Sequence, residues 1–228
     1  MNEFLRLAIE REVRGSEFWN IQCLSFGDFT LKSGRKSPYF FNAGGFSTGS
    51  DLSVIGNCYA ETISESGIVF DVLFGPAYKG IPLVCCAAMA MSGRLGRPVE
   101  YLFNRKTCKD HGEGGLLVGA IRTVERILRS GRRPRVYLVD DVITAGTAVR
   151  EAVQLLRESG CELVGVCVLL DRQERMSSGL TALEELSRDL AIPVDAVATL
   201  TDLASTVQDP NARASLQAYV SLCENESI

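Results

Sequence analysis

The chain has 228 residues and a formal net charge of −4 at pH 7, and 46% of its residues are hydrophobic. This composition is typical of one globular domain with a small appendage, and its mild acidity argues against nucleic acid as the main partner. No apolar run approaches the roughly 20 residues that span a bilayer. The N-terminus does not resemble a signal peptide, so we expect a cytoplasmic protein whose eight cysteines are reduced thiols.

The first fifty residues predict a helix followed by a small β unit. Leu5, Ala8, Ile9 and Val13 recur at helical spacing, and β-type segments are expected at 26–32 and 39–42. From residue 51 onward, helices and strands alternate. We expect helices at 51–66 and 81–92 and from 149 to a stop at Gly160, and strands at 70–74, 99–103, 136–139, 163–170 and 196–200. Continuous apolar strands between helices predict a parallel sheet that is covered on both faces, with ligands bound at the carboxyl ends of its strands.

Residues 135–152, RVYLVDDVITAGTAVREA, are the most informative stretch of the chain. A strand pattern ends on Asp140 and Asp141, a loop of small residues follows at 144–148, and a helical pattern begins there. Free N–H groups at a helix start bind phosphate, and adjacent carboxylates accept hydrogen bonds from ribose hydroxyls. The stretch therefore predicts a sugar-phosphate site, with an ordinary strand–loop–helix unit as the alternative. No Gly-Lys-Ser/Thr follows, which excludes a Walker P-loop.

Two further segments place cations beside glycines. GPAYKGIP, residues 75–82, follows a strand end and holds Lys79 between glycines that permit close approach of the backbone to a ligand. A plain turn is the alternative. NRKTCKDHGEGG, residues 104–115, concentrates three cations and the single histidine before three glycines. This pattern is typical of a lid that closes over a polyanion and excludes water, or otherwise of a solvated charged loop.

A fourth segment, FTLKSGRKSPYFFN at residues 29–42, sets three cations beside the run Tyr39-Phe40-Phe41. Consecutive aromatic residues on a strand point to both faces of the strand. One face enters the core, and a ring on the other face can stack on a flat anionic heterocycle.

Together the four segments resemble the orotate phosphoribosyltransferases. FTLKSGRKSPYFFNAG, FGPAYKGIPL, FNRKxxKDHGEGG and LVDDVITAGTA match that family in this order, over about residues 26–172. The resemblance implies the type I phosphoribosyltransferase fold, an α/β fold with a Rossmann-like parallel sheet flanked by helices and a small N-terminal hood subdomain. We expect a single domain over residues 1–228, with the N-terminal helix and hood at about 1–50 and the α/β core at about 51–228, including a lid loop at 104–115.

The activity that the resemblance implies joins orotate to 5-phosphoribosyl-1-pyrophosphate (PRPP), giving orotidine 5′-monophosphate and pyrophosphate in pyrimidine (UMP) biosynthesis. Mg²⁺ is the implied cofactor and is held mainly through PRPP, with no direct protein ligands. The implied assembly is a homodimer that shares the lid loop across its interface. No nucleic-acid or membrane partner is expected, and a separate orotidylate decarboxylase is a candidate partner.

Site residues carry over from the family position by position. Lys109, His111, Asp140 and Asp141 are the implied catalytic residues; the first two stabilise or protonate the leaving pyrophosphate. PRPP binding is assigned to Lys79, Arg105, Lys106, Lys109, His111, Asp140, Asp141, Val142, Ile143, Thr144, Ala145, Gly146, Thr147 and Ala148. The orotate pocket is assigned to Lys32, Phe40, Phe41, Tyr78, Lys79, Thr144 and Arg172. The planar fork of Arg172 suits a carboxylate or a carbonyl.

Two other functions stay open on the sequence. The first is a phosphoribosyltransferase for another base, against which Arg172 and the 32–41 segment argue. The second is a PRPP-sensing regulator without enzymatic activity, which would not use Lys109 and His111 in a glycine-flanked lid. Residues 120–134 are longer than the connection expected between the lid and the signature strand. They predict a helix extension or a surface loop and are assigned no chemistry.

Overall fold

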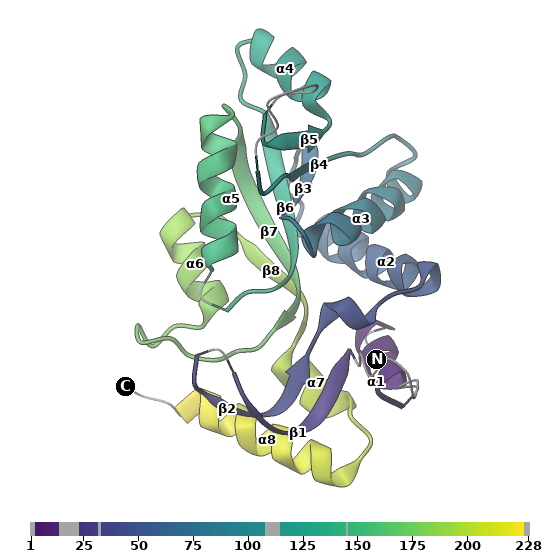
Figure 1. Ribbon diagram of the computed structural model, residues 1–228, viewed down its shortest axis with the longest axis vertical. Coiled ribbons are helices and arrows are strands. Elements are labelled where there is room, and N and C mark those ends of the chain that lie inside the picture. Colours follow the sequence, from purple (N-terminus) through teal and green to yellow (C-terminus); the bar gives the residue numbers. More distant parts are fainter. Residues whose placement is uncertain (1–2, 14–22, 32, 108–114, 145, 226–228) are drawn as a thin grey trace.

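The computed structural model describes residues 3–13, 23–31, 33–107, 115–144 and 146–225 (Figure 1). Its centre is a six-stranded sheet in the order β5-β4-β3-β6-β7-β8. The strands of this sheet are β3 (Val72–Gly75), β4 (Glu100–Asn104), β5 (Leu117–Gly119), β6 (Arg135–Val142), β7 (Glu162–Asp171) and β8 (Val194–Thr199). The helices are α1 (Glu3–Val13), α2 (Gly49–Glu65), α3 (Gly80–Leu95), α4 (Ile121–Arg129), α5 (Thr147–Glu158), α6 (Ala182–Leu190), α7 (Leu200–Thr206) and α8 (Pro210–Asn225).

The predicted parallel sheet is confirmed from β4 to β8, where every neighbouring pair is parallel. The expectation of an all-parallel sheet needs one correction, because β5 pairs antiparallel with β4 at one edge. β4 and β5 are consecutive strands on either side of the segment expected to form the lid, and they pair as a hairpin does. A chain that turns back directly on its own strand pairs antiparallel with it.

Different helices cover the two faces of the sheet (Figure 1). Along β6, Val136 and Leu138 belong to the buried cluster beneath α5 and α6. Tyr137 and Val139 alternate with them and belong to the cluster beneath α2 and α3. Side chains on both faces are therefore buried, which explains the unbroken apolar pattern of this strand.

A hood lies at one end of the sheet (Figure 1). It contains the antiparallel hairpin β1 (Leu24–Thr30) and β2 (Lys36–Phe41), with α1 packed against it. The C-terminal helix α8 also lies against β2, where the Tyr39 and Tyr219 ring centroids are 6.3 Å apart. The hood is therefore built from both ends of the chain.

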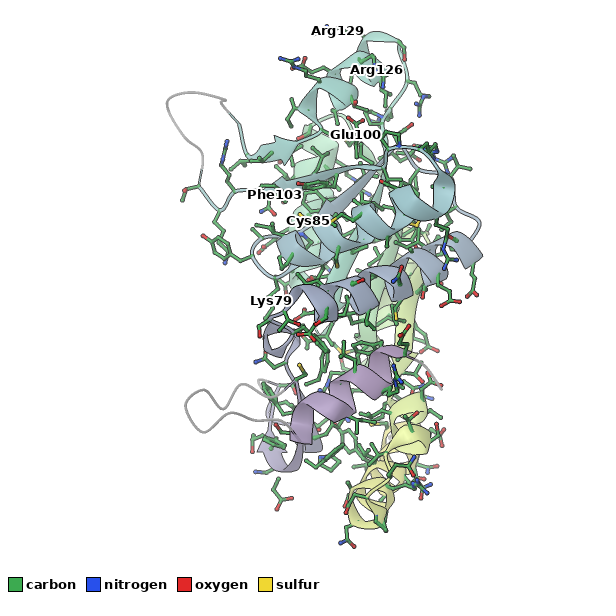
Figure 2. All side chains as sticks on the ribbon, turned by 90° about the vertical axis from the view of Figure 1, so that its right-hand side faces the viewer. Lys79, Cys85, Glu100, Phe103, Arg126 and Arg129 are labelled. Carbon is green, nitrogen blue, oxygen red and sulfur yellow. The ribbon has the colours of Figure 1, made fainter. Side chains whose placement is uncertain are left out.

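The 120–134 connection forms the helix α4, which lies at the opposite end of the molecule from the hood (Figure 2). Its residues Val124 and Ile127 are buried, and Arg126 and Arg129, which Figure 2 labels, belong to the same helix. No helix in the described part of the chain combines the length and the apolar character needed to cross a membrane.

Candidate active site

Two buried carboxylates stand at the carboxyl end of β6, the strand between β3 and β7. Asp140 and Asp141 are each 7% exposed. The Asp141 N–H donates to Asp140 Oδ1 at 2.9 Å, and the Val142 N–H donates to Asp141 Oδ1 at 2.9 Å. Because the backbone holds both side chains, their orientations are set before any ligand binds.

Lys79 reaches the same place from the turn between β3 and α3. Its Nζ lies 2.8 Å from Asp141 Oδ2, and its side chain is 56% exposed, against 10% for Asp141. Figure 2 shows Lys79 at the start of α3. Two segments that lie some sixty residues apart in the sequence thus supply one cation and two carboxylates to a single site.

The environment of Asp140 changes the pKa of its carboxyl group. Its burial, followed by the charge of Asp141, raises its pKa from 3.8 to about 7. Sequence reasoning did not identify Tyr59 of α2 as part of this arrangement. The buried Tyr59 hydroxyl donates to the Asp140 backbone carbonyl at 2.7 Å and so ties the end of β6 to α2.

The pKa of Asp140 predicts a pH dependence of stability. Between about pH 4 and pH 7 the folded chain keeps a proton that the unfolded chain has lost, so stability falls as pH rises through this window. Asp140→Asn removes this dependence. We expect the difference in free energy of unfolding, variant minus parent, to increase from pH 4 to pH 7 and to stay level above pH 7. Urea denaturation at each pH measures this difference. A difference that does not change with pH would contradict the raised pKa.

The loop that follows β6 leads into a helix start without a side-chain cap. The N-cap residues of α2, α6 and α7 are threonines that form capping boxes, whereas the N-cap residue of α5 is Gly146, which has a φ of 69° and no side chain. Thr147 and Ala148, in the first turn, are exposed. The first-turn N–H groups of a helix need an outside acceptor, and an anion supplies one. The described part of the loop therefore has the features of a phosphate site.

The turn from β3 to α3 is closed by contact between two stretches of backbone. A Cβ on Gly75 would lie 2.1 Å from the Gly80 carbonyl oxygen, and a Cβ on Gly80 would lie 2.6 Å from Pro76 Cδ. The Ala77 N–H donates to Asn104 Oδ1 at 2.8 Å, which ties the turn to the end of β4. The sequence predicts that these glycines let the backbone approach a ligand. The structure shows a second role, since they also let β3 and α3 pack closely.

The described parts of the lid segment begin beside this turn. Lys106 Nζ lies 4.9 Å from the centroid of the exposed Tyr78 ring. The Arg105 N–H donates to the Leu116 carbonyl at 2.7 Å and closes the β4–β5 hairpin. Four of the predicted site residues lie outside the described residues: Lys32, Lys109, His111 and Ala145.

Arg172 follows the end of β7 and is 6% exposed. Its Nε and Nη2 donate to Glu174 Oε1 at 2.9 and 2.6 Å. Its guanidinium carbon lies 4.5 Å from the centroid of the Tyr39 ring, and its Nη2 lies 3.3 Å from Ser37 Oγ. The strand end thus meets β2 of the hood. Sequence reasoning did not identify Ser37 or Glu174 as partners of Arg172.

The aromatic run of β2 is divided between the two faces of the strand, as expected. Tyr39 and Phe41 are buried, and Phe41 lies in edge contact with Phe4, with ring centroids 5.9 Å apart. Phe40 is 45% exposed and lies 5.8 Å from the Phe29 ring. Of the two phenylalanines assigned to the pocket, Phe40 therefore presents an open ring, and Phe41 packs into the core.

Known proteins resemble this chain over most of its length. Residues 52–179 match the family model described as the phosphoribosyl transferase domain. An orotate phosphoribosyltransferase of Cronobacter sakazakii is 50% identical over 204 residues, which are 88% of this chain and 91% of that protein. One of Salmonella arizonae is 48% identical over 207 residues, covering 91% and 88%. Among solved structures, the orotate phosphoribosyltransferase of Francisella tularensis has a TM-score of 0.74 and 36% identity, covering 95% of this chain and 98% of its own.

Proposed function

The chain belongs to the orotate phosphoribosyltransferases, and we propose that its active site is the carboxyl edge of the sheet at β3, β4, β6 and β7. As a member of this family it transfers the 5-phosphoribosyl group of PRPP to orotate in pyrimidine biosynthesis. One observation carries the placement of the site. Lys79 pairs with Asp141 at 2.8 Å, beside a helix start with no side-chain cap.

In the reaction, the bond between the anomeric carbon of PRPP and its pyrophosphate oxygen breaks. A ring nitrogen of orotate gives up its proton to solvent and forms the new bond to that carbon with its electron pair. Pyrophosphate leaves with the electrons of the old bond and can take up a proton. Positive charge develops on the ribose ring and negative charge on the leaving group. The chain therefore has to position the two substrates, neutralise the leaving group and exclude water.

For PRPP, the first turn of α5 and its loop supply N–H donors to the 5′-phosphate, through Thr144, Gly146, Thr147 and Ala148. Asp140 and Asp141 accept hydrogen bonds from the ribose hydroxyls. Lys79 exchanges Asp141 for the pyrophosphate as PRPP enters, since its exposed side chain can turn at low cost.

For orotate, Arg172 pairs with a carboxylate or carbonyl oxygen, and the exposed Phe40 ring stacks on the flat base. Lys32, Tyr78 and Thr144 complete the pocket. Phe41 supports β2 from the core side, where it contacts Phe4. A small anionic heterocycle suits a pocket with one planar cation and one ring face.

The residues present fit Mg²⁺ held mainly through PRPP. Asp140 and Asp141 are oxygen donors of the kind that Mg²⁺ accepts. In the described part of the chain, no three His, Cys, Asp or Glu side chains gather as a cage made of protein alone. When bound, Mg²⁺ would take most of its ligands from the diphosphate and water and would lower the charge on the leaving group.

A homodimer that shares the lid across its interface is part of the proposal, together with a cytoplasmic location and a separate orotidylate decarboxylase that consumes the product. The described cysteines support a reducing compartment, since each of them is a free thiol.

The lid residues Lys109 and His111 predict a loss of turnover. Lys109→Ala or His111→Ala is expected to lower kcat by about 100-fold, because each substitution removes a side chain that stabilises or protonates the departing pyrophosphate. The affinity for orotate, measured by titration, should change less than about 2-fold, a difference of about 0.4 kcal/mol. Arg129→Ala is the matched control, since it removes a cation that pairs with Glu125 on the distant α4. Equal losses of turnover and of orotate affinity would contradict the assigned role.

The proposed function is tested by following the ultraviolet absorbance of orotate with the purified chain, PRPP and Mg²⁺. Loss of the signal only when all three components are present supports the proposal. No loss while PRPP still binds would favour another base or a PRPP-sensing regulator.

A further inference from the structure

The segment after β7 connects the guanidinium of Arg172 to the C-terminal helix. A single oxygen, Glu174 Oε1, accepts hydrogen bonds from both Nε and Nη2 of Arg172. Nη1 has no hydrogen-bond partner among the residues that the structure describes. The guanidinium is therefore held along one edge, while its Nη1 donors remain available to a ligand.

Glu174 is itself held by α8. The Tyr219 hydroxyl donates to the same Oε1 at 2.9 Å. Burial, followed by the negative charge of Glu174, raises the pKa of Tyr219, so the hydroxyl stays protonated and donates. Because this one oxygen receives both Arg172 bonds and the Tyr219 bond, the position of α8 sets the position of the fork.

Two further contacts fix the loop that carries Glu174. Arg175 Nε donates to the Cys223 carbonyl of α8 at 3.2 Å. Arg35 Nη2, from the turn of the hood hairpin, donates to the Arg175 carbonyl at 2.8 Å. The loop is thus held by α8 on one side and by the hairpin on the other.

The flat face of the guanidinium is fixed by the same helix. Tyr39 lies against this face, with its ring centroid 4.5 Å from the guanidinium carbon. The Tyr219 ring meets the Tyr39 ring edge to face, with an interplanar angle of 73°. Tyr219 therefore holds both the anionic partner of Arg172 and the aromatic ring on which it stacks.

We propose that Glu174 and Tyr219 are positioning residues for base recognition, and that they hold Arg172 with its Nη1 donors facing orotate. The inference rests on the assignment of orotate to Arg172. A side chain that is already ordered loses less conformational entropy when its ligand binds. The contribution of both residues therefore falls on the affinity for orotate, and PRPP binding at the end of β6 is unaffected.

Tyr219→Phe tests the inference with a minimal change, since it keeps the ring and removes the hydroxyl. We expect KM for orotate to rise about 3-fold to 10-fold, equivalent to the loss of one ordinary hydrogen bond, with KM for PRPP unchanged. Glu174→Gln should raise KM for orotate about 10-fold to 100-fold, because a buried guanidinium loses its counter-charge. Glu174→Asp should not restore it, since the shorter side chain cannot reach Arg172 and Tyr219 together.

Tyr137→Phe is the matched control. It removes a tyrosine hydrogen bond of similar length, 3.1 Å to Asp195, between β6 and β8. A purely structural role for Tyr219 predicts that both variants lower Tm and leave KM for orotate alone, and that result would overturn the inference.

Arg172→Ala separates this inference from the proposed function. A large rise in KM for orotate with Arg172→Ala, but none with Tyr219→Phe or Glu174→Gln, would overturn the positioning role alone. An unchanged KM with Arg172→Ala would remove the assignment of Arg172 to orotate and the inference with it.

Discussion

Replacing Asp141 by alanine is expected to lower kcat/KM for PRPP by about 100-fold to 10,000-fold. In the proposed site the carboxylate accepts two hydrogen bonds from ribose hydroxyls, and a bond to a charged group contributes about 1.5–3 kcal/mol. The backbone already orients this carboxylate, through the Val142 N–H at 2.9 Å. The substitution therefore removes an acceptor that was in place before PRPP arrived.

The same substitution should change Tm little. Within the protein it breaks the pair with Lys79, whose side chain is 56% exposed and easily solvated, and one bond from the neighbouring, partly exposed Val142. Asp71→Ala is the matched control, because away from the site Asp71 accepts three hydrogen bonds, two from Arg132 at 2.7 and 2.8 Å and one from the Arg135 N–H at 2.7 Å. It should lower Tm and keep kcat/KM, the reverse of Asp141→Ala. Steady-state kinetics with thermal unfolding distinguishes the two, and a kcat/KM within 3-fold of the parent for Asp141→Ala would reject the ribose assignment.

The central strands were predictable because they are buried on both faces. β6 and β7 read as unbroken apolar runs, and in the structure they lie between the two buried clusters. β5 was not predictable on the same grounds. It has three residues, Leu117–Gly119, none of them buried. Its place in the sheet is defined by its pairing with β4 rather than by a pattern of its own.

For the three helices nearest the C-terminus, the sequence contains signals for where each helix begins but none for what α8 packs against. Thr181 and Thr199 are the N-cap residues of α6 and α7, and each is followed three residues later by the acid of a capping box. Such a spacing predicts a helix start from sequence alone. α8 also has a start signal, since Asp209 Oδ1 accepts from the Ala212 N–H at 2.7 Å and Pro210 follows. The signal that was not present is the partner of its buried residues, because no pattern in α8 indicates that it packs against the hood.

Within the site, the local motifs were readable and the contacts between them were not. The acids at 140–141 and the loop that follows form a continuous pattern, so their place at a strand end is confirmed. The partner of Arg172 stands two residues later, in a run of charges that reads as a surface loop. Only the folded chain shows that Glu174 joins Arg172 to Tyr219, 45 residues further along.

Gly75→Ala is expected to lower kcat by about 100-fold by moving the turn that carries Lys79. The new Cβ would lie 2.1 Å from the Gly80 carbonyl oxygen and 2.8 Å from Val84 Cβ, so either β3 or α3 must shift. A displacement of about 1 Å at a positioned group costs about 100-fold in rate. Overpacking of this kind also lowers stability by about 3 kcal/mol.

Gly93→Ala, within α3, supplies the contrast, because a Cβ there meets nothing within 4 Å. This substitution should leave kcat unchanged and stabilise α3 by about 0.5–1 kcal/mol, since alanine loses less conformational entropy in a helix than glycine does. Urea denaturation measures the stability of both variants, and the orotate assay measures their kcat. Parent-like kinetics for Gly75→Ala would mean that the turn adapts to a side chain. Its two glycines would then serve the approach of PRPP rather than the packing of β3 on α3.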